Sequence, residues 1–147
     1  MATQTEQRCS VRVLVVDDCP DTAESLRLLL SLKGHAVVAA HDGAEALAVA
    51  RAFRPEVVLL DIALPGMDGY QVARRLRQEP GLEDVTLVAA TGLVLDRDGR
   101  QVREAGFDRH LVKPFGPEEL CEVLADCGRP TGRGEIARPH IAFKEAY

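Results

Sequence analysis

Five short apolar runs alternate along the chain with five segments of helical periodicity, and this alternation restricts the fold more than any other feature. Each run is rich in valine, leucine or alanine and short enough for a buried strand. The strand-like runs cover residues 10–16, 36–40, 57–60, 85–90 and 111–112. The helix-like segments cover residues 21–34, 41–53, 69–78, about 96–105 and 117–128. Such alternation is typical of right-handed crossovers, so we predict an α/β fold with a doubly wound, five-stranded parallel sheet and five helices.

Particular residues mark the predicted starts of three helices. Asp21 and Glu24 have the spacing of a capping box at the start of the first helix, and Asp42 and Glu45 repeat it before the second. Pro117 suits the first turn of the last helix. We therefore expect both Asp-x-x-Glu pairs to cap their helices.

The composition favours one acidic globular domain. A chain of 147 residues is long enough to bury a core, and no apolar run approaches the roughly 18 residues of a membrane span. The net charge of -5 and the pI near 5.4 argue against direct binding to nucleic acid. The polar start MATQTEQRCS shows no export signal, so we expect a cytoplasmic protein with no membrane contact.

The cysteines and histidines form no metal or redox motif. No C-x-x-C pair and no H-E-x-x-H motif occurs, and no serine lies in a G-x-S-x-G sequence. We interpret the cysteines as reduced thiols. They are Cys9, Cys19, Cys121 and Cys127.

Polar side chains of a particular kind follow the predicted strands. Asp61 ends the apolar run in VVLLDIALPGMDG, Asp17 and Asp18 follow the first strand, Thr91 follows the fourth, and Lys113 the fifth. Alone, each has an ordinary explanation as a strand end, a helix start, a turn or a surface amine. Because ligands of open α/β sheets bind beyond the carboxyl ends of the strands, the group together predicts a site there.

The chemistry of this group points to phosphoryl transfer. Neighbouring carboxylates repel each other by about 4 kcal/mol per pair at 4 Å for an effective dielectric constant of 20, so Asp17, Asp18 and Asp61 require a cation. Oxygen ligands with room for water and phosphate favour Mg²⁺. Asp61 then suits a nucleophile that forms an acyl phosphate, while Thr91 and Lys113 donate hydrogen bonds to the phosphoryl oxygens.

At this point the sequence resembles the receiver domain of two-component response regulators, over about residues 10–127. The matching motifs are VLVVDD with Asp17 and Asp18, LLDIALPGMDG with Asp61, AATG with Thr91, and LVKPF with Lys113.

The resemblance implies a flavodoxin-like receiver fold with strand order 2-1-3-4-5. It implies that a histidine kinase or histidine phosphotransfer protein phosphorylates Asp61. Mg²⁺ would be held in the acidic cluster that includes Asp17, by Asp18, Asp61 and the backbone carbonyl of Ala63. Such a domain is no enzyme beyond its own phosphorylation and dephosphorylation, and it signals to a downstream protein as a monomer or weak dimer.

Three positions depart from the family pattern or are specific to this chain. His110 occupies a position where the family often has Tyr or Phe, so it is either a packing residue or a pH-sensitive part of the switch. Ala63 and Gly92 flank the acceptor with small side chains that leave access for water.

The resemblance also implies a cis bond between Lys113 and Pro114.

Residues 1–9 are expected to form an N-terminal extension, and residues 128–147 a tail that is either solvated or a docking segment. Two alternatives to the phospho-acceptor remain. One is a pseudo-receiver that binds partners without being phosphorylated. The other is an enzyme of the same topology, but Ala63 stands where a haloacid-dehalogenase-like phosphatase needs a second Asp, and DDCPDT does not resemble a flavodoxin phosphate loop.

Overall fold

The computed structural model describes residues 11–64, 66–91, 100–113 and 115–127. Its sheet has five parallel strands in the order β2-β1-β3-β4-β5, which confirms the predicted topology. The strands are β1 (Arg12–Val16), β2 (Ala36–Ala40), β3 (Val57–Asp61), β4 (Thr86–Thr91) and β5 (Arg109–Val112). The helices are α2 (Pro20–Leu32), α3 (Gly43–Phe53), α4 (Gly69–Gln78), α5 (Arg100–Glu104) and α6 (Pro117–Cys127).

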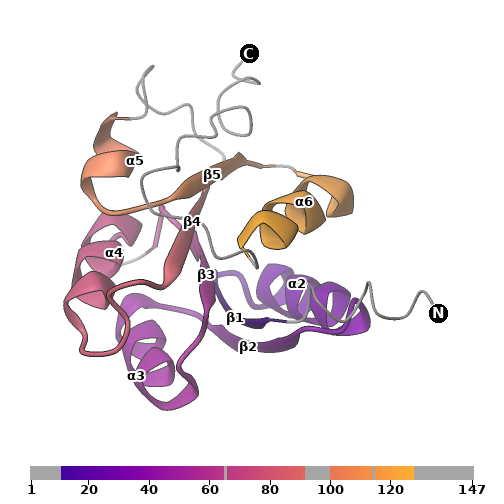
Figure 1. The fold of residues 1–147 in the computed structure, drawn as a ribbon, viewed down its shortest axis with the longest axis horizontal. Coiled ribbons are helices and arrows are strands. Elements are labelled where there is room, and N and C mark those ends of the chain that lie inside the picture. The colour runs from indigo at the N-terminus through magenta and orange to yellow at the C-terminus, as the bar shows by residue number, and fades with distance from the viewer. Residues whose placement is uncertain (1–10, 65, 92–99, 114, 128–147) are drawn as a thin grey trace.

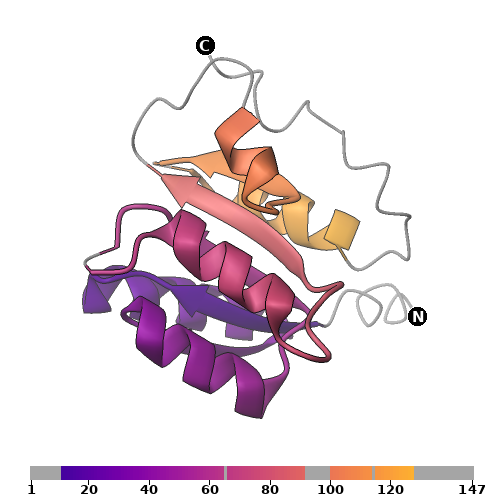
Figure 2. The ribbon, with the colours of Figure 1, turned by 90° about the vertical axis from the view of Figure 1, so that its left-hand side faces the viewer.

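Helices cover both faces of the sheet. Helices α3, α4 and α5 lie on one face, and α2 and α6 lie on the other (Figures 1 and 2). Each face has its own apolar core. In the central strand β3, Val58 and Leu60 pack into the first core, and Val57 and Leu59 into the second. This two-sided burial explains why the strand is a continuous apolar run rather than an alternating one.

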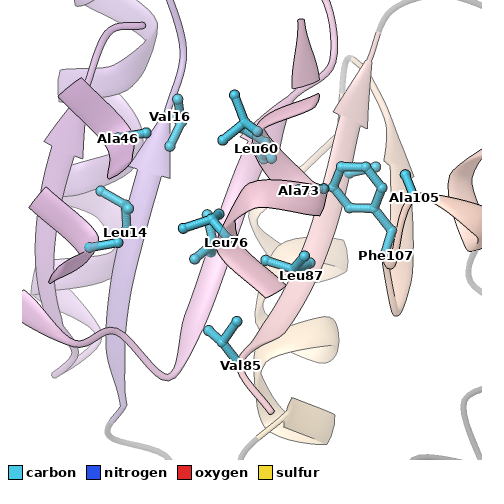
Figure 3. Packing of buried hydrophobic residues seen from close by; sticks show 14 of the residues in the cluster. Leu14, Val16, Ala46, Leu60, Ala73, Leu76, Val85, Leu87, Ala105 and Phe107 are labelled. Atoms are coloured by element: carbon cyan, nitrogen blue, oxygen red, sulfur yellow. The ribbon is translucent and has the colours of Figure 1, made fainter. Parts of the chain in front are cut away.

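The first of these cores fills the space between β1, β3, β4 and helices α3 and α4. Figure 3 shows Leu60 and Leu87 of the sheet beside Leu76 of α4. All three side chains are fully buried. The helix predicted over residues 69–78 is therefore confirmed, and it packs against the sheet.

The two predicted capping pairs have different outcomes. At α2 the prediction is wrong: the N-cap is Cys19, no side chain caps the helix, and Glu24 pairs with Arg27 instead. Pro20, whose fixed φ suits the first helical position, starts the helix one residue before Asp21.

At α3 the prediction is confirmed in its main part. Asp42 is the N-cap, and its side chain accepts a hydrogen bond of 2.8 Å from the backbone N–H of Glu45. The Glu45 carboxylate accepts from the backbone N–H of His41, one residue before the cap. Helix α4 has a complete capping box between Asp68 and Gln71, which was not predicted from the sequence.

Two strand boundaries shift toward the predicted site. Strand β3 includes Asp61, and β4 runs from Thr86 to Thr91 rather than over 85–90. Both polar residues are therefore held by the sheet itself. The helix expected over 96–105 is α5, with residues 96–99 outside the described part of the chain. Among the described residues, no helix is long and apolar enough to cross a membrane.

A single arginine connects α4 to the chain before β4 and β5. The Arg77 guanidinium donates to the backbone carbonyls of Glu83, Val85 and Gly106 and pairs with Asp108 at 2.8 Å. The same Asp108 oxygen accepts from the N–H of Leu87 in β4. This network fixes the start of β5, and thereby the strand that leads to Lys113.

Gly69 allows α4 to begin directly against the end of β3. A Cβ atom at Gly69 would lie 2.5 Å from the Cα of Ile62 and 2.7 Å from the carbonyl oxygen of Asp61. Its own N–H donates to the carbonyl of Ile62. Because backbone atoms cannot yield as a flexible side chain can, only glycine fits here.

We predict that Gly69→Ala lowers the free energy of unfolding by about 1–3 kcal/mol, the usual cost of overpacking. Urea denaturation measures it. Gly116→Ala is the matched control, because a Cβ at Gly116 meets no atom within 4 Å. Equal stability of the two variants would contradict the close approach at Gly69.

Candidate functional site: an acidic pocket with a bridging lysine

The strand ends bring the predicted polar residues to one edge of the sheet. Val16 of β1 pairs with Leu60 of β3, so Asp17 and Asp61, each the next residue, emerge side by side. The backbone N–H of Asp17 donates to the carbonyl of Ala40, which extends the pairing of β1 with β2 past the end of the strand. Lys113 follows the last residue of β5 at the same edge.

The Lys113 ammonium bridges the two buried carboxylates. Its Nζ lies 3.0 Å from Asp17 Oδ2 and 3.2 Å from Asp61 Oδ2. The side chains of Asp17 and Asp61 are only 5% and 9% exposed, whereas that of Lys113 is 30% exposed. Lys113 is thus a counterion inside the site. Its ordinary explanation, a solvated surface amine, is wrong.

Each buried carboxylate uses its second oxygen to hold the turn that follows it. Asp17 Oδ1 accepts from the backbone N–H of Cys19 at 2.9 Å, and Asp61 Oδ1 accepts from that of Ala63 at 3.0 Å. Both side chains are therefore held in position from two directions. These two backbone donors were not among the predicted site residues, although both are two residues after their Asp, the spacing of an Asx turn.

The electrostatic balance of the site favours the charged form of Lys113. Burial alone would lower the pKa of its ammonium group, but the hydrogen bonds to Asp17 and Asp61 outweigh burial and raise this pKa above its usual value. Lys113 is consequently a full positive charge at neutral pH. A charge-assisted hydrogen bond of this kind is stronger than a neutral one.

The site still has excess negative charge. Carboxylate oxygens of Asp17, Asp18 and Asp61 lie within 4.8 Å of one another. Three carboxylates and one ammonium sum to -2, the complement of a divalent cation. The donors are all hard oxygens, and Asp18 is exposed, which leaves room for the waters that Mg²⁺ usually keeps. The triad resembles the Mg²⁺ site of receiver domains, and these residues fit that ion.

The other predicted residues are placed only in part. Thr91 is the last residue of β4 and pairs with Val112, but its side chain is outside what the structure describes. Pro114 and Gly92 lie outside the described residues, so the cis bond at Pro114 stays a prediction. Ala63 is exposed beside Asp61. His110 is 5% exposed, and its role in a switch also stays a prediction.

Comparison with known proteins places the chain in the family that its motifs resemble. The family model described as "Response regulator receiver domain" matches residues 13–125. The chain belongs to this family, whose members are receiver domains rather than enzymes in the usual sense.

Its relatives include the DNA-binding response regulator MtrA of Mycolicibacterium smegmatis, 44% identical over 109 residues, with 74% of this chain and 46% of MtrA covered. The response regulator MprA of Mycobacterium bovis is 42% identical over 111 residues, covering 76% of this chain and 47% of MprA. The chain thus spans about half the length of the curated relatives that it matches.

Two solved structures are similar in fold and in sequence. The chemotaxis protein CheY4 of Vibrio cholerae has a TM-score of 0.76 and 29% identity, with 80% of this chain and 98% of CheY4 covered. The receiver domain of the sensor histidine kinase PA1611 of Pseudomonas aeruginosa has a TM-score of 0.73 and 29% identity, covering 81% and 98%. The PA1611 structure has a magnesium ion coordinated in its active site cleft.

Replacing Lys113 tests its role as a counterion. We predict that Lys113→Met lowers the free energy of unfolding by about 1–3 kcal/mol without divalent cations, because two buried carboxylates lose a charged partner. Mg²⁺ should restore more stability to this variant than to the wild-type chain, because the acids then lack their internal cation.

Urea denaturation with EDTA or with Mg²⁺ measures both effects. Lys33→Met, at an exposed lysine beyond α2, is the matched control and should change neither. If Mg²⁺ raised the free energy of unfolding equally in wild type and Lys113→Met, the lysine would not balance the charge of the carboxylates.

Proposed function

We propose that this chain accepts a phosphoryl group on Asp61 from a phosphohistidine protein and transmits the resulting change through protein contacts. The observation that carries the proposal is the ammonium of Lys113 between the buried carboxylates of Asp17 and Asp61. This arrangement provides a fixed nucleophile, a cation for the incoming phosphate and a charge balance that requires a divalent metal.

The acceptor role of Asp61 follows from its position. Its carboxylate lies at the end of a rigid central strand, and the Ala63 N–H and the Lys113 ammonium orient it. A carboxylate oxygen attacks the phosphorus atom, the bond from phosphorus to the donor nitrogen breaks, and the imidazole departs with that electron pair. The product is an acyl phosphate on Asp61.

The neighbouring groups stabilise the charge of the transferred phosphoryl group. Lys113 can turn from the carboxylates to a phosphoryl oxygen, because its amine already lies within 3.2 Å of Asp61 Oδ2. By resemblance, Asp18, Asp61 and the Ala63 carbonyl would hold Mg²⁺, with Asp17 beside them. The cation would neutralise phosphate charge during transfer, for which positioning and electrostatics supply most of the catalysis. The Thr91 hydroxyl is the remaining proposed donor.

Receiver domains interact with histidine kinases, so a sensor histidine kinase or a histidine phosphotransfer protein is the expected donor. The downstream partner is proposed to be a protein rather than nucleic acid, because the chain is acidic. The switch would act through the segment after Thr91 and change the surface formed by α5, the strand that carries His110, and α6. This surface would carry partner binding. Moving an equilibrium between two conformations from 1:99 to 99:1 needs about 5.5 kcal/mol of preference for one of them. Several charge-assisted hydrogen bonds to the phosphoryl group can supply this free energy.

The experiment is incubation of the chain with acetyl phosphate and Mg²⁺, followed by intact-mass measurement. We predict that the wild-type chain gains the mass of one phosphoryl group only when Mg²⁺ is present, and that Asp61→Asn gains none. Asp84→Asn, an exposed position before β4 at the opposite edge of the sheet, is the matched control and should label like wild type.

Two outcomes would count against the proposal. Equal labelling of wild type and Asp61→Asn would place the phosphoryl group on another residue. A folded wild-type chain that binds Mg²⁺ but is labelled neither by acetyl phosphate nor by phosphorylated kinase would be a pseudo-receiver.

A further inference from the structure

The outer face of α2 carries two leucines that the described part of the domain leaves in solvent. Leu28 is 49% and Leu32 is 83% exposed, and no other large hydrophobic residue among the described ones is classed as exposed. They are four positions apart and therefore lie next to each other along the helix. Leu30, by contrast, is fully buried toward the sheet. The two leucines form a small apolar ridge, which we call the α2 ridge.

The topology places the end of α6 at the same edge of the sheet as this ridge. Helix α2 runs back from the end of β1 to the start of β2, so Leu32 lies near the edge where the strands begin. Helix α6 starts after β5 and runs in the same direction, with its end away from the strand arrowheads (Figure 2). Both helices belong to the same core and lie on the same face (Figure 1).

The 20 residues that follow Cys127 have the composition to cover the α2 ridge. Their sequence, GRPTGRGEIARPHIAFKEAY, has no large hydrophobic side chain before Ile136. The later part adds Ile141, Phe143 and Tyr147. Packed helices on one face lie about 8–10 Å apart, and the nine steps from Cys127 to Ile136 span up to roughly 30 Å when extended. The apolar part of the tail can therefore reach Leu28 and Leu32.

Opposite net charges favour contact between the tail and the rest of the chain in general. Residues 128–147 contain four basic and two acidic residues, whereas residues 1–127 contain 14 basic and 21 acidic residues. The net charge of residues 128–147 is thus +2, and that of the remaining residues is -7. In addition, α6 has no basic residue in its last turn, where the helix dipole favours cations. Arg129 and Arg133 follow α6 closely in the sequence.

We propose that residues 136–147 of this chain dock on the α2 ridge, with their aromatic side chains against Leu28 and Leu32. The contact is intramolecular and does not depend on phosphorylation of Asp61. The docked tail would cover the second half of α2, at the end of the helix that lies away from the acidic pocket. A protein that binds α2 would then have to displace the tail.

The test is NMR of the full chain with labelled leucine methyl groups. We expect nuclear Overhauser contacts between the methyl groups of Leu28 or Leu32 and the ring protons of Phe143 or Tyr147. The double variant Phe143→Ala with Tyr147→Ala should abolish them and shift the methyl signals of Leu28 and Leu32. The Leu30 signal should stay in place. Glu145→Gln, a polar change in the same segment, is the matched control and should retain the contacts.

Two results would overturn the proposal. The first is a wild-type chain without such contacts whose Leu28 and Leu32 signals are identical in the double variant. The second is contacts that disappear on dilution or that join differently labelled copies in a mixed sample, because the occupant would then be a second copy of the chain.

Discussion

The ion pair between Lys113 and the carboxylates of Asp17 and Asp61 connects the fold of this chain to its chemistry. Two nearly buried acids at 5% and 9% exposure would be costly without a counterion. The lysine supplies one positive charge from a different strand, so the site forms only when β1, β3 and β5 end at the same edge. The charge left over is -2 when Asp18 is included, which makes the pocket ready for a divalent cation and then for a phosphoryl group.

The parallel sheet meets this requirement through its register. Adjacent strands pair residue by residue up to Val16 with Leu60, Asp61 with Ala90, and Thr91 with Val112. Further from the pocket, Arg77 and Asp108 fix the start of β5 through backbone contacts with three segments. Gly69 lets α4 begin against the carbonyl of Asp61. The position of Asp61 is therefore determined by packing on several sides and not by its own loop alone.

Most of this arrangement could be predicted because its signals are local. The apolar runs and the helix periodicity predict the strands and helices, and the topology then gathers Asp17, Asp61 and Lys113. The false prediction concerned α2, where Pro20 at the first helical position determined the start and the Asp21 and Glu24 spacing was coincidental. The contacts of Gly69 and Arg77 could not be predicted, because they join segments whose distance is set only by tertiary packing.

A crystal structure of the chain with Mg²⁺ and beryllofluoride would show which carboxylate accepts a phosphoryl group, since beryllofluoride mimics a phosphoryl group on a carboxylate. We expect beryllofluoride on Asp61, with the Lys113 ammonium in contact with a fluorine atom and the cation held by Asp18, Asp61 and the carbonyl of Ala63. Beryllofluoride on another carboxylate, or an Asp61 still bridged to Asp17 by Lys113 at saturating Mg²⁺ and beryllofluoride, would contradict this expectation.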